Sequence, residues 1–300
     1  MSEDIKKIRQ KIDSLDNDIL DLFNQRAHQA VLIAKEKNKS KELDNFYNPE
    51  REAQVIRRIQ ELNKGPLSNE SVLKLFREVM SACLSLEAPL KVSYLGPEGT
   101  YTQLAAKNHF GSSILSVPHL SVEEVFSSVE KRDSHYGVVP VENSTQGIVA
   151  STLDMFMKSS LKISGEIEIL INHNILANSR SLDSIEKIYA HPQSFSQCKN
   201  WLEKNLPKCE KINSLSNAEA ALIASKEKNS GAIASSVAAD IYKLDILSEN
   251  IEDNHNNSTR FLVIGERDTD PSGNDKTSII VSTKNDSGAL YSLLEPLSKH

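Results

Sequence analysis

Charged side chains interrupt an otherwise apolar helical pattern at the start of the chain, and they are the first candidates for chemistry. The interruptions are Arg26, Lys37, Glu52 and Glu87. Any one of them could extend its long side chain to solvent from a helix end. Four together, with Arg9 and Arg51 nearby, favour another interpretation, because charges buried in a helix bundle need neutralising partners. An arginine guanidinium can donate two hydrogen bonds to one carboxylate. The pattern therefore predicts a site for a small molecule with two carboxylates.

The helices that would hold these charges are marked by apolar spacing and by capping residues. Apolar residues at alternating spacings of three and four predict one long helix, of about 35 residues and ~50 Å. Its stripe is Ile5, Ile8, Ile12, Leu15, Ile19 and Leu22. A second helix is expected from Asn48 as cap and Pro49 to Asn63, and a third from Ser68. Because residues 1–90 are too few to cover so long a helix, we expect an intertwined dimer of two such helices.

The chain changes character after this helical segment. Residues 1–90 hold 15 basic and 15 acidic residues and only one of the 11 glycines, whereas the remainder carries the whole net charge of −6. Pro89 marks the first domain boundary, and a polar linker with Pro and Gly at residues 268–275 marks the second. We therefore expect a multi-domain chain: an all-α part at 1–90, an α/β part at 91–268 and a partial third domain at 275–300.

Short apolar runs alternate with helical patterns through the middle region, which predicts an α/β domain with its ligand beyond the strand ends. Expected strands are 92–95, 136–141, 161–171, 188–190, 231–234 and 261–264, and expected helices are 102–109, 121–131, 147–158, 194–205, 217–227 and 236–242. Four polar motifs fall at those ends, at residues 96–102, 140–147, 191–198 and 256–261. Tight turns and helix caps could explain parts of them, and we interpret His191 as a structural residue.

The helical segment resembles the all-helical type of chorismate mutase, an intertwined dimer of three-helix subunits. The residues that carry the resemblance are Arg9, Arg26, Lys37 and the runs 48–52 and 81–87. The resemblance implies that the carboxylates of chorismate are held by cations that include Arg26, Arg51 and the partner subunit's Arg9. It also implies that Lys37 and Glu87 bracket the breaking ether bond and that Glu52 binds the ring hydroxyl.

This segment departs from better-known members at three positions. Glu87 stands where some carry glutamine, Cys83 where some carry serine and Asn48 where some carry aspartate. A carboxyl group donates a hydrogen bond only when it is protonated, so we expect mutase activity to fall as pH rises through a raised Glu87 pKa.

The four motifs of the middle region, in their order, resemble prephenate dehydratase, whose fold has two α/β lobes with the substrate between them. The first lobe would comprise about 91–172 and 250–268, and the second the stretch between. The resemblance implies that Thr259 donates to the departing hydroxyl. Anion-binding groups would include Arg260, Gly99 and Thr100, and the ring would be oriented by Asn143, Ser144, Thr145 and Gln197. Together the two segments resemble the bifunctional bacterial chorismate mutase/prephenate dehydratase family of phenylalanine biosynthesis. Ala190 departs from relatives that carry serine there.

The last residues resemble the start of an ACT domain, which in this family binds phenylalanine across a dimer interface and inhibits the enzyme. A strand is expected at 277–283 and a helix from Gly288, with Gly288, Ala289 and Leu290 as the regulatory segment. The remainder of that domain is not in the sequence, so we expect feedback inhibition of this chain to be weak or lost.

Composition excludes several other classes. The charged N-terminus has no apolar signal segment and no apolar run is long enough to span a membrane, so a cytoplasmic protein is expected. The acidic balance disfavours nucleic acid, and 3 Cys without CxxC spacing disfavour zinc. Neither expected reaction calls for a metal or organic cofactor. Two alternatives are a two-lobed binding protein with a helical dimerisation arm and a ligand-sensing regulator with a helical oligomerisation module.

Overall fold

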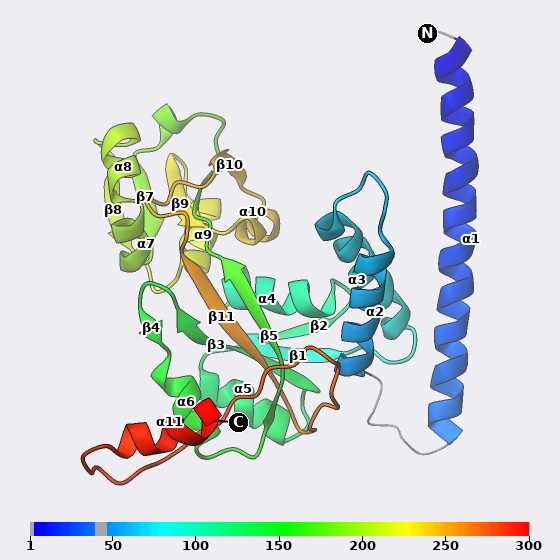
Figure 1. Ribbon diagram of the computed structural model, residues 1–300. Helices are drawn as coiled ribbons and strands as arrows, with labels where there is room; N and C mark the ends of the chain where they lie inside the picture. Colours follow the sequence, from blue (N-terminus) through cyan, green and yellow to red (C-terminus); the bar gives the residue numbers. More distant parts are fainter. Residues whose placement is uncertain (1–2, 40–46, 300) are drawn as a thin grey trace. The chain divides into compact units, whose positions relative to one another are not determined.

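The computed structural model describes residues 3–39 and 47–299 and divides the chain into two units, Met1–Thr269 and Asp270–His300. Unit 1 begins with three helices (Figure 1): α1 (Glu3–Lys39), α2 (Pro49–Leu62) and α3 (Asn69–Ser85). The three predicted helices are confirmed. Asn48 caps α2 by accepting a hydrogen bond from the Arg51 amide over 2.6 Å, and Ser68 caps α3 through the Ser71 amide.

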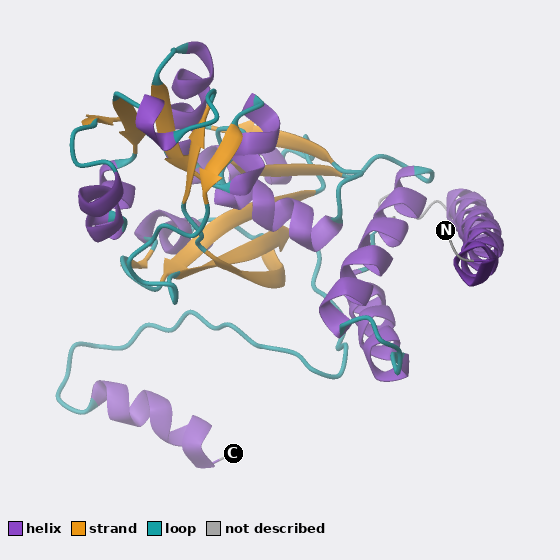
Figure 2. Ribbon diagram, turned by 90° about the horizontal axis from the view of Figure 1, so that it is seen from above, coloured by secondary structure: helices purple, strands orange, loops and turns teal. Residues whose placement is uncertain are grey.

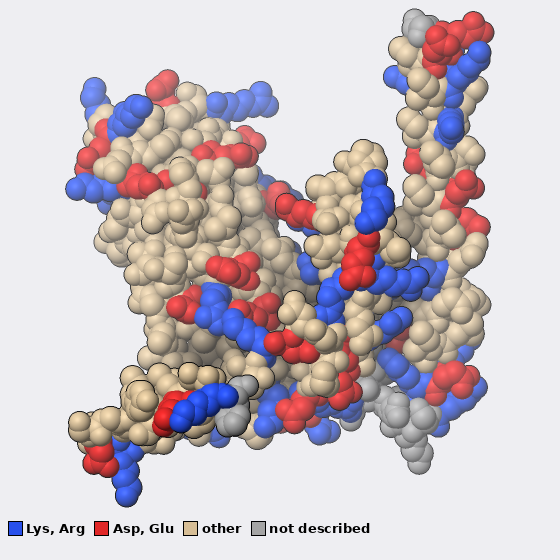
Figure 3. Space-filling view, in the orientation of Figure 1, with Lys and Arg blue, Asp and Glu red and all other residues tan. Residues whose placement is uncertain are grey.

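The apolar stripe of α1 is uncovered in the single chain. Between 44% and 61% of each of its six side chains is exposed, from Ile5 to Leu22. The charged residues of this helix fall in runs of one sign, and both signs are visible on the face shown in Figure 3. Lys6, Lys7, Arg9 and Lys11 are followed by Asp13, Asp16, Asp18 and Asp21. A helix that leaves so much apolar surface in water gains little from its own subunit.

Two sheets, each covered by helices on both faces, make up the rest of unit 1 (Figures 1 and 2). The first sheet has the order β2-β1-β3-β11-β5, with β4 beside β3, and β1 runs parallel to β2 and β3. Its strands are β1 (Lys91–Leu95), β2 (Leu115–His119), β3 (Tyr136–Asn143), β4 (Gly147–Ile148), β5 (Lys162–Leu170) and β11 (Ser258–Gly265). Helix α4 (Tyr101–Phe110) packs on one face, and α5 (Val122–Glu130) and α6 (Ala150–Phe156) pack on the other.

The second sheet has the order β10-β6-β9-β7-β8, with β7 parallel to β8 and β9. Its strands are β6 (Asn174–Ala177), β7 (Lys187–Ala190), β8 (Glu210–Asn213), β9 (Ser230–Ala234) and β10 (Asp245–Ser248). A 3₁₀ turn (Leu182–Ser184) precedes β7. Helices α7 (Pro192–Gln197) and α8 (Lys199–Asn205) cover one face, and α9 (Asn217–Lys226) and α10 (Ser236–Tyr242) cover the other.

The helical part of unit 1 is joined to the first sheet through Tyr47. Its ring is only 7% exposed and packs edge-on against Phe110 and Tyr136, with ring centroids 5.1 and 5.3 Å away. The Ser113 amide donates to Ser81 Oγ of α3 over 3.2 Å beside it. Aromatic burial and a polar contact therefore anchor the residues around α2 and α3 on the sheet.

All six predicted strands of the middle region are confirmed, and β2, β4, β6, β8 and β10 were not predicted. The short strand β4 occupies the start of the helix expected at 147–158. Three of these unpredicted strands lie at sheet edges and carry proline or charged residues, so their composition lacks a strand signal. The predicted helix at 194–205 is divided at Cys198, whose φ of −114° and ψ of 17° interrupt the helical path.

Unit 2 departs from the sequence prediction. The strand expected at 277–283 is wrong, because those residues have no neighbouring strand with which to pair. The expected helix is confirmed as α11 (Ala289–Lys299), and Gly288 precedes it with a φ of +83°. Residues 288–290, which were expected to form a regulatory segment, lie at the start of this helix, with Leu290 67% exposed.

Candidate active sites

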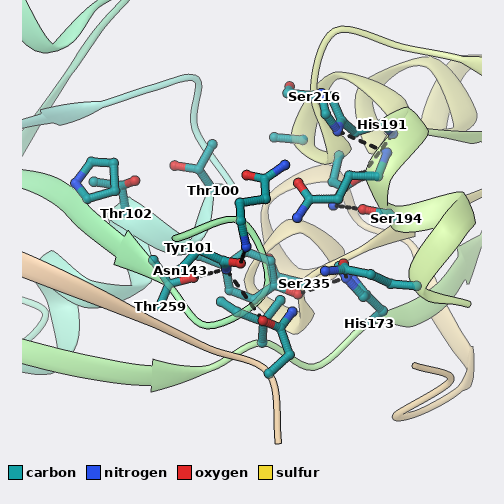
Figure 4. Close-up of a pocket in the computed structure, with 18 of the residues that line it drawn as sticks. Thr100, Tyr101, Thr102, Asn143, His173, His191, Ser194, Ser216, Ser235 and Thr259 are labelled. Carbon is teal, nitrogen blue, oxygen red and sulfur yellow. Dashed lines mark hydrogen bonds between the residues drawn. The ribbon is translucent and has the colours of Figure 1, made fainter. Parts of the chain in front are cut away.

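A pocket of about 310 Å³ lies where the carboxyl ends of β1, β7, β8 and β9 meet. Its walls come from both sheets, with Thr100, Asn143 and Thr259 from the first and His191, Ser216 and Ser235 from the second (Figure 4). Within the described ranges, none of the side chains that line it is lysine, arginine, aspartate or glutamate. An anion in this pocket would therefore be held by hydroxyls, amides and the polypeptide backbone.

Thr259 is positioned as a hydrogen-bond donor toward the pocket. Asn143 Oδ1 accepts from the backbone amides of Thr145 and Gln146 over 2.9 and 3.1 Å, which fixes the orientation of its side-chain amide. Asn143 Nδ2 consequently donates to Thr259 Oγ1 over 2.7 Å (Figure 4). Because the oxygen of Thr259 accepts this bond, its own hydroxyl proton is available for a bound molecule.

Ser144 and Thr145 have a different role from the one expected. Their hydroxyls donate to Asn257 Oδ1 over 3.0 and 3.1 Å, and neither residue lines the pocket. Asn257, which is only 4% exposed, does line it, as does Gln146. Sequence reasoning assigned roles to the two hydroxyls and none to Asn257 or Gln146, although all four lie in the polar motifs.

Arg260, for which an anion-binding role was expected, does not line the pocket. Its guanidinium pairs with Glu142 and with Glu166, the latter over 3.0 Å. Successive side chains of a strand point to opposite faces, so an arginine that follows Thr259 faces away from the cavity. These carboxylates also raise the pKa of Arg260, chiefly through the hydrogen bond to Glu166.

Gly99 and Thr100 lie at the pocket, but their polar groups are already engaged. The Gly99 amide donates to Gln103 Oε1 over 2.7 Å. Thr100 Oγ1 donates to the Leu95 carbonyl over 3.2 Å and caps α4. Tyr101 and Thr102 also line the pocket, and their amides in the first turn of α4 have no intrahelical acceptor.

A second helix start faces the same cavity from the other sheet. Asn217 and Ala218 are the first two residues of α9, which Ser216 caps over 3.0 Å, and both line the pocket. Helix starts carry partial positive charge and unsatisfied amides. The pocket is therefore electropositive at two places without a cationic side chain.

Gln197 lines the pocket and contacts His173 there. Its Oε1 lies 2.8 Å from His173 Nε2, while its Nε2 is buried and has no hydrogen-bond partner among the residues at 3–39 and 47–299. His191 caps α7, because its Nδ1 accepts from the Gln193 amide over 3.3 Å, and it also lines the pocket.

In the helical part, the structure brings Lys37 and Glu87 together. Lys37 Nζ lies 3.9 Å from Glu87 Oε2, and this carboxylate oxygen is buried with no hydrogen-bond partner in the described part of the chain. Burial raises the pKa of Glu87, and the nearby Lys37 opposes that rise. The structure leaves Arg9, Arg26 and Arg51 exposed in the single chain.

Glu52 lies beside Arg77, a residue to which sequence reasoning gave no role. Glu52 Oε1 is 4.0 Å from Arg77 Nε, and only 18% of the glutamate side chain is exposed. Burial raises the pKa of Glu52 to about 7, against the effect of Arg77. A glutamate that protonates near neutrality can donate or accept a hydrogen bond.

The fold and pocket define a two-lobed α/β enzyme domain preceded by a helical domain. Residues 92–269 match the prephenate dehydratase family, and residues 8–88 match the family chorismate mutase type II. The chain belongs to the bifunctional chorismate mutase/prephenate dehydratase family. It is an enzyme with both activities and acts in phenylalanine biosynthesis.

Individual relatives agree over nearly the whole chain. A bifunctional chorismate mutase/prephenate dehydratase of Pseudomonas aeruginosa is 49% identical over 298 residues, which cover 98% of this chain and 82% of the relative. One from Aquifex aeolicus is 45% identical over 302 residues, covering 99% and 83%. The solved prephenate dehydratase of Arthrobacter aurescens, in complex with L-Phe, is similar over 70% of this chain and 72% of its own, with a TM-score of 0.62 and 26% identity. Within the described residues, no helix is long and apolar enough to cross a membrane.

Proposed function

We propose that the uncharged pocket is the dehydratase site and that Thr259 donates a hydrogen bond to the hydroxyl that leaves prephenate. The reaction breaks the ring C–O bond and the bond to the ring carboxylate as the ring becomes aromatic. It releases carbon dioxide and hydroxide, and the hydroxide takes up a proton to leave as water. The departing oxygen gains negative charge as its bond lengthens, so a fixed donor lowers the barrier. The observation that carries this assignment is the bond from Asn143 Nδ2 to Thr259 Oγ1, which leaves the threonine proton free.

The two carboxylates of prephenate are proposed to bind at the starts of α4 and α9. The amides of Tyr101 and Thr102 lie on one wall and those of Asn217 and Ala218 on the other. Both carboxylates are carried on the ring carbon opposite the hydroxyl, one directly and one at the end of a keto-acid side chain, so each can reach its own electropositive site. This placement replaces the clamp by Arg260, whose charge is already neutralised by two glutamates.

Substitution of Thr259 tests the assignment. Thr259→Ala removes the donor and is expected to lower dehydratase kcat about 100-fold or more, while chorismate is still converted to prephenate at the normal rate. Thr259→Ser keeps a hydroxyl and is expected to retain most of the activity. Equal loss of both activities in Thr259→Ala would argue against separate sites, and full dehydratase activity would exclude the proposed role.

For the mutase, we infer an intertwined dimer in which α1 of each copy covers the other. The support is the exposed stripe of α1 together with the exposed Arg9 and Arg26, which need a second chain to enclose a di-acid. Lys37 and Glu87 would bracket the ether oxygen, Arg26 and Arg51 would hold carboxylates with the partner subunit's Arg9, and Glu52 would bind the ring hydroxyl.

A matched pair of variants tests this dimer. Leu15→Lys places a charge within the stripe, whereas Asn17→Lys places the same charge on the opposite side of α1. Leu15→Lys is expected to give monomers in light scattering and to lose mutase activity with dehydratase activity retained, and Asn17→Lys is expected to do neither. A Leu15→Lys protein that stays dimeric with an active mutase would contradict the inferred arrangement.

A further inference from the structure

His173 lies between the two sheets, after β5 and before β6, and lines the dehydratase pocket. Its side chain is only 2% exposed. The ring meets Tyr101 edge-on, with centroids 6.2 Å apart, and its backbone amide donates to Glu252 Oε2 over 2.8 Å. The imidazole is therefore held firmly, and Figure 4 places it across the pocket from Asn143 and Thr259.

The ring has one short side-chain contact, to Gln197. His173 Nε2 is 2.8 Å from Gln197 Oε1, whereas Nδ1 is 3.5 Å from the Tyr101 hydroxyl. If Nε2 carries the proton, it donates to the glutamine carbonyl and turns the glutamine NH2 group away from the histidine. That nitrogen is buried without a hydrogen-bond partner in the described ranges, and such a group is costly unless a bound molecule satisfies it.

We propose that His173 is a positioning residue for dehydration: its Nε2–H fixes the Gln197 amide so that the NH2 group points at the substrate. This inference rests on the proposed dehydratase site. Every polar group of prephenate can accept a hydrogen bond, and its carboxylates can only accept. The reversed glutamine would present its carbonyl oxygen to that anion, so the tautomer of one histidine decides whether this wall of the pocket attracts or repels substrate.

The surroundings of the ring agree with a neutral imidazole that carries a single proton. Burial lowers the pKa of His173, although Gln197 and Glu252 act in the opposite direction. With one proton on the ring, the short contact to Gln197 is a hydrogen bond from Nε2 to the glutamine carbonyl in the Nε2–H tautomer, which is the tautomer that the proposal requires. His173 thus acts through Gln197 and need not touch the reacting atoms.

Two substitutions of His173 separate positioning from simple packing. The side-chain nitrogen of glutamine reaches about as far from the backbone as Nε2, and that of asparagine only about as far as Nδ1. His173→Gln is therefore expected to retain most of the dehydratase kcat/KM, and His173→Asn to lose about 10- to 100-fold. Mutase activity of the same proteins should not change and reports correct folding. Equal losses in the two variants, or full activity in His173→Asn, would overturn the proposal.

A double-variant cycle then tests whether His173 acts through Gln197. In a Gln197→Ala background, His173→Asn should cause no further loss, because the group that it positions is gone. Losses that multiply would overturn the proposal.

If the His173 variants do not fold, Gln197→Glu remains informative, because it replaces the NH2 group by an oxygen and is expected to raise KM at least 10-fold. An unchanged KM in Gln197→Glu would also overturn it. If the pocket is not the dehydratase site, Thr259→Ala will keep the activity of the wild-type dehydratase. This result separates failure of the proposed site from failure of the role proposed for His173.

Discussion

Ser235 Oγ donates a hydrogen bond to the Gly99 carbonyl over 2.9 Å, and this contact joins the two sheets at the edge of the dehydratase pocket. Tyr242 donates to the neighbouring Glu98 carbonyl over 2.9 Å. Gly99 has a φ of +87°, and a Cβ added there would lie 3.2 Å from the Ala238 Cβ. The glycine therefore allows both a left-handed turn and the close approach of α10.

Gly99→Ala is expected to lower stability and dehydratase kcat/KM more than an alanine at a glycine with free space around it. An alanine at positive φ costs about 1–2 kcal/mol, and here the methyl group also presses against α10. Gly147→Ala is the matched control, because Gly147 has a φ of +80° but nothing lies within 4 Å of its added Cβ. Denaturant unfolding and both enzyme assays should show a larger loss of stability and of dehydratase kcat/KM in Gly99→Ala. Equal effects in the two variants would mean that the approach of α10 is unimportant.

Parts of the dehydratase site could be predicted from sequence because they depend on local patterns. Thr259 and Asn143 were both identified from polar motifs at strand ends, but their contact depends on the antiparallel register of β11 and β3, which makes them direct partners. Nothing in the motifs specifies that register, because pairing between distant strands is fixed by tertiary packing. The same holds for His173, which lies outside all four motifs and gains its role from a contact with α7.

The orientation of Arg260 depends on a strand that is longer than the sequence predicts. Thr259 and Arg260 are adjacent in β11, so their side chains face opposite sides, but the predicted strand begins only at residue 261. Arg260 pairs with Glu166, which lies in a predicted strand, and with Glu142, which lies just beyond the predicted strand 136–141. The apolar stripe of α1 was predicted correctly from sequence, but the single chain leaves this stripe exposed to solvent.

Asn143→Asp is expected to disable the dehydratase by reversing one hydrogen bond. An aspartate carboxylate would accept the hydroxyl proton of Thr259, which would then no longer point to the leaving group. We expect kcat to fall about 100-fold at neutral pH and to recover in part as acid protonates the aspartate. Asn256→Asp adds the same charge to an exposed residue of a nearby loop and should have little effect. A dehydratase equally impaired by both substitutions would indicate a general effect of charge.

Mutase activity is expected to fall as pH rises through the raised pKa of Glu87. Burial raises this pKa and Lys37 opposes the rise. The protonated carboxyl, which can donate to the ether oxygen, predominates below that pKa and is lost above it. Glu87→Gln is a donor at every pH, so its kcat/KM profile should lack this decline, whereas Glu70→Gln, at an exposed ion pair on α3, should keep it. A wild-type profile that is flat from acid to alkaline pH would exclude protonation of Glu87 as a requirement.

Phenylalanine is expected to inhibit this chain only weakly. Residues 270–299 form an extended segment and one helix, and Leu290, Leu294 and Leu297 remain 67%, 49% and 64% exposed. An extended segment and one helix of this size cannot enclose a small apolar ligand without further structure. The dehydratase assay with added L-phenylalanine, and with L-tyrosine as control, measures this directly. Strong inhibition by phenylalanine alone would contradict the expectation, and its loss in Leu290→Ala would then assign the binding site to the segment that contains α11.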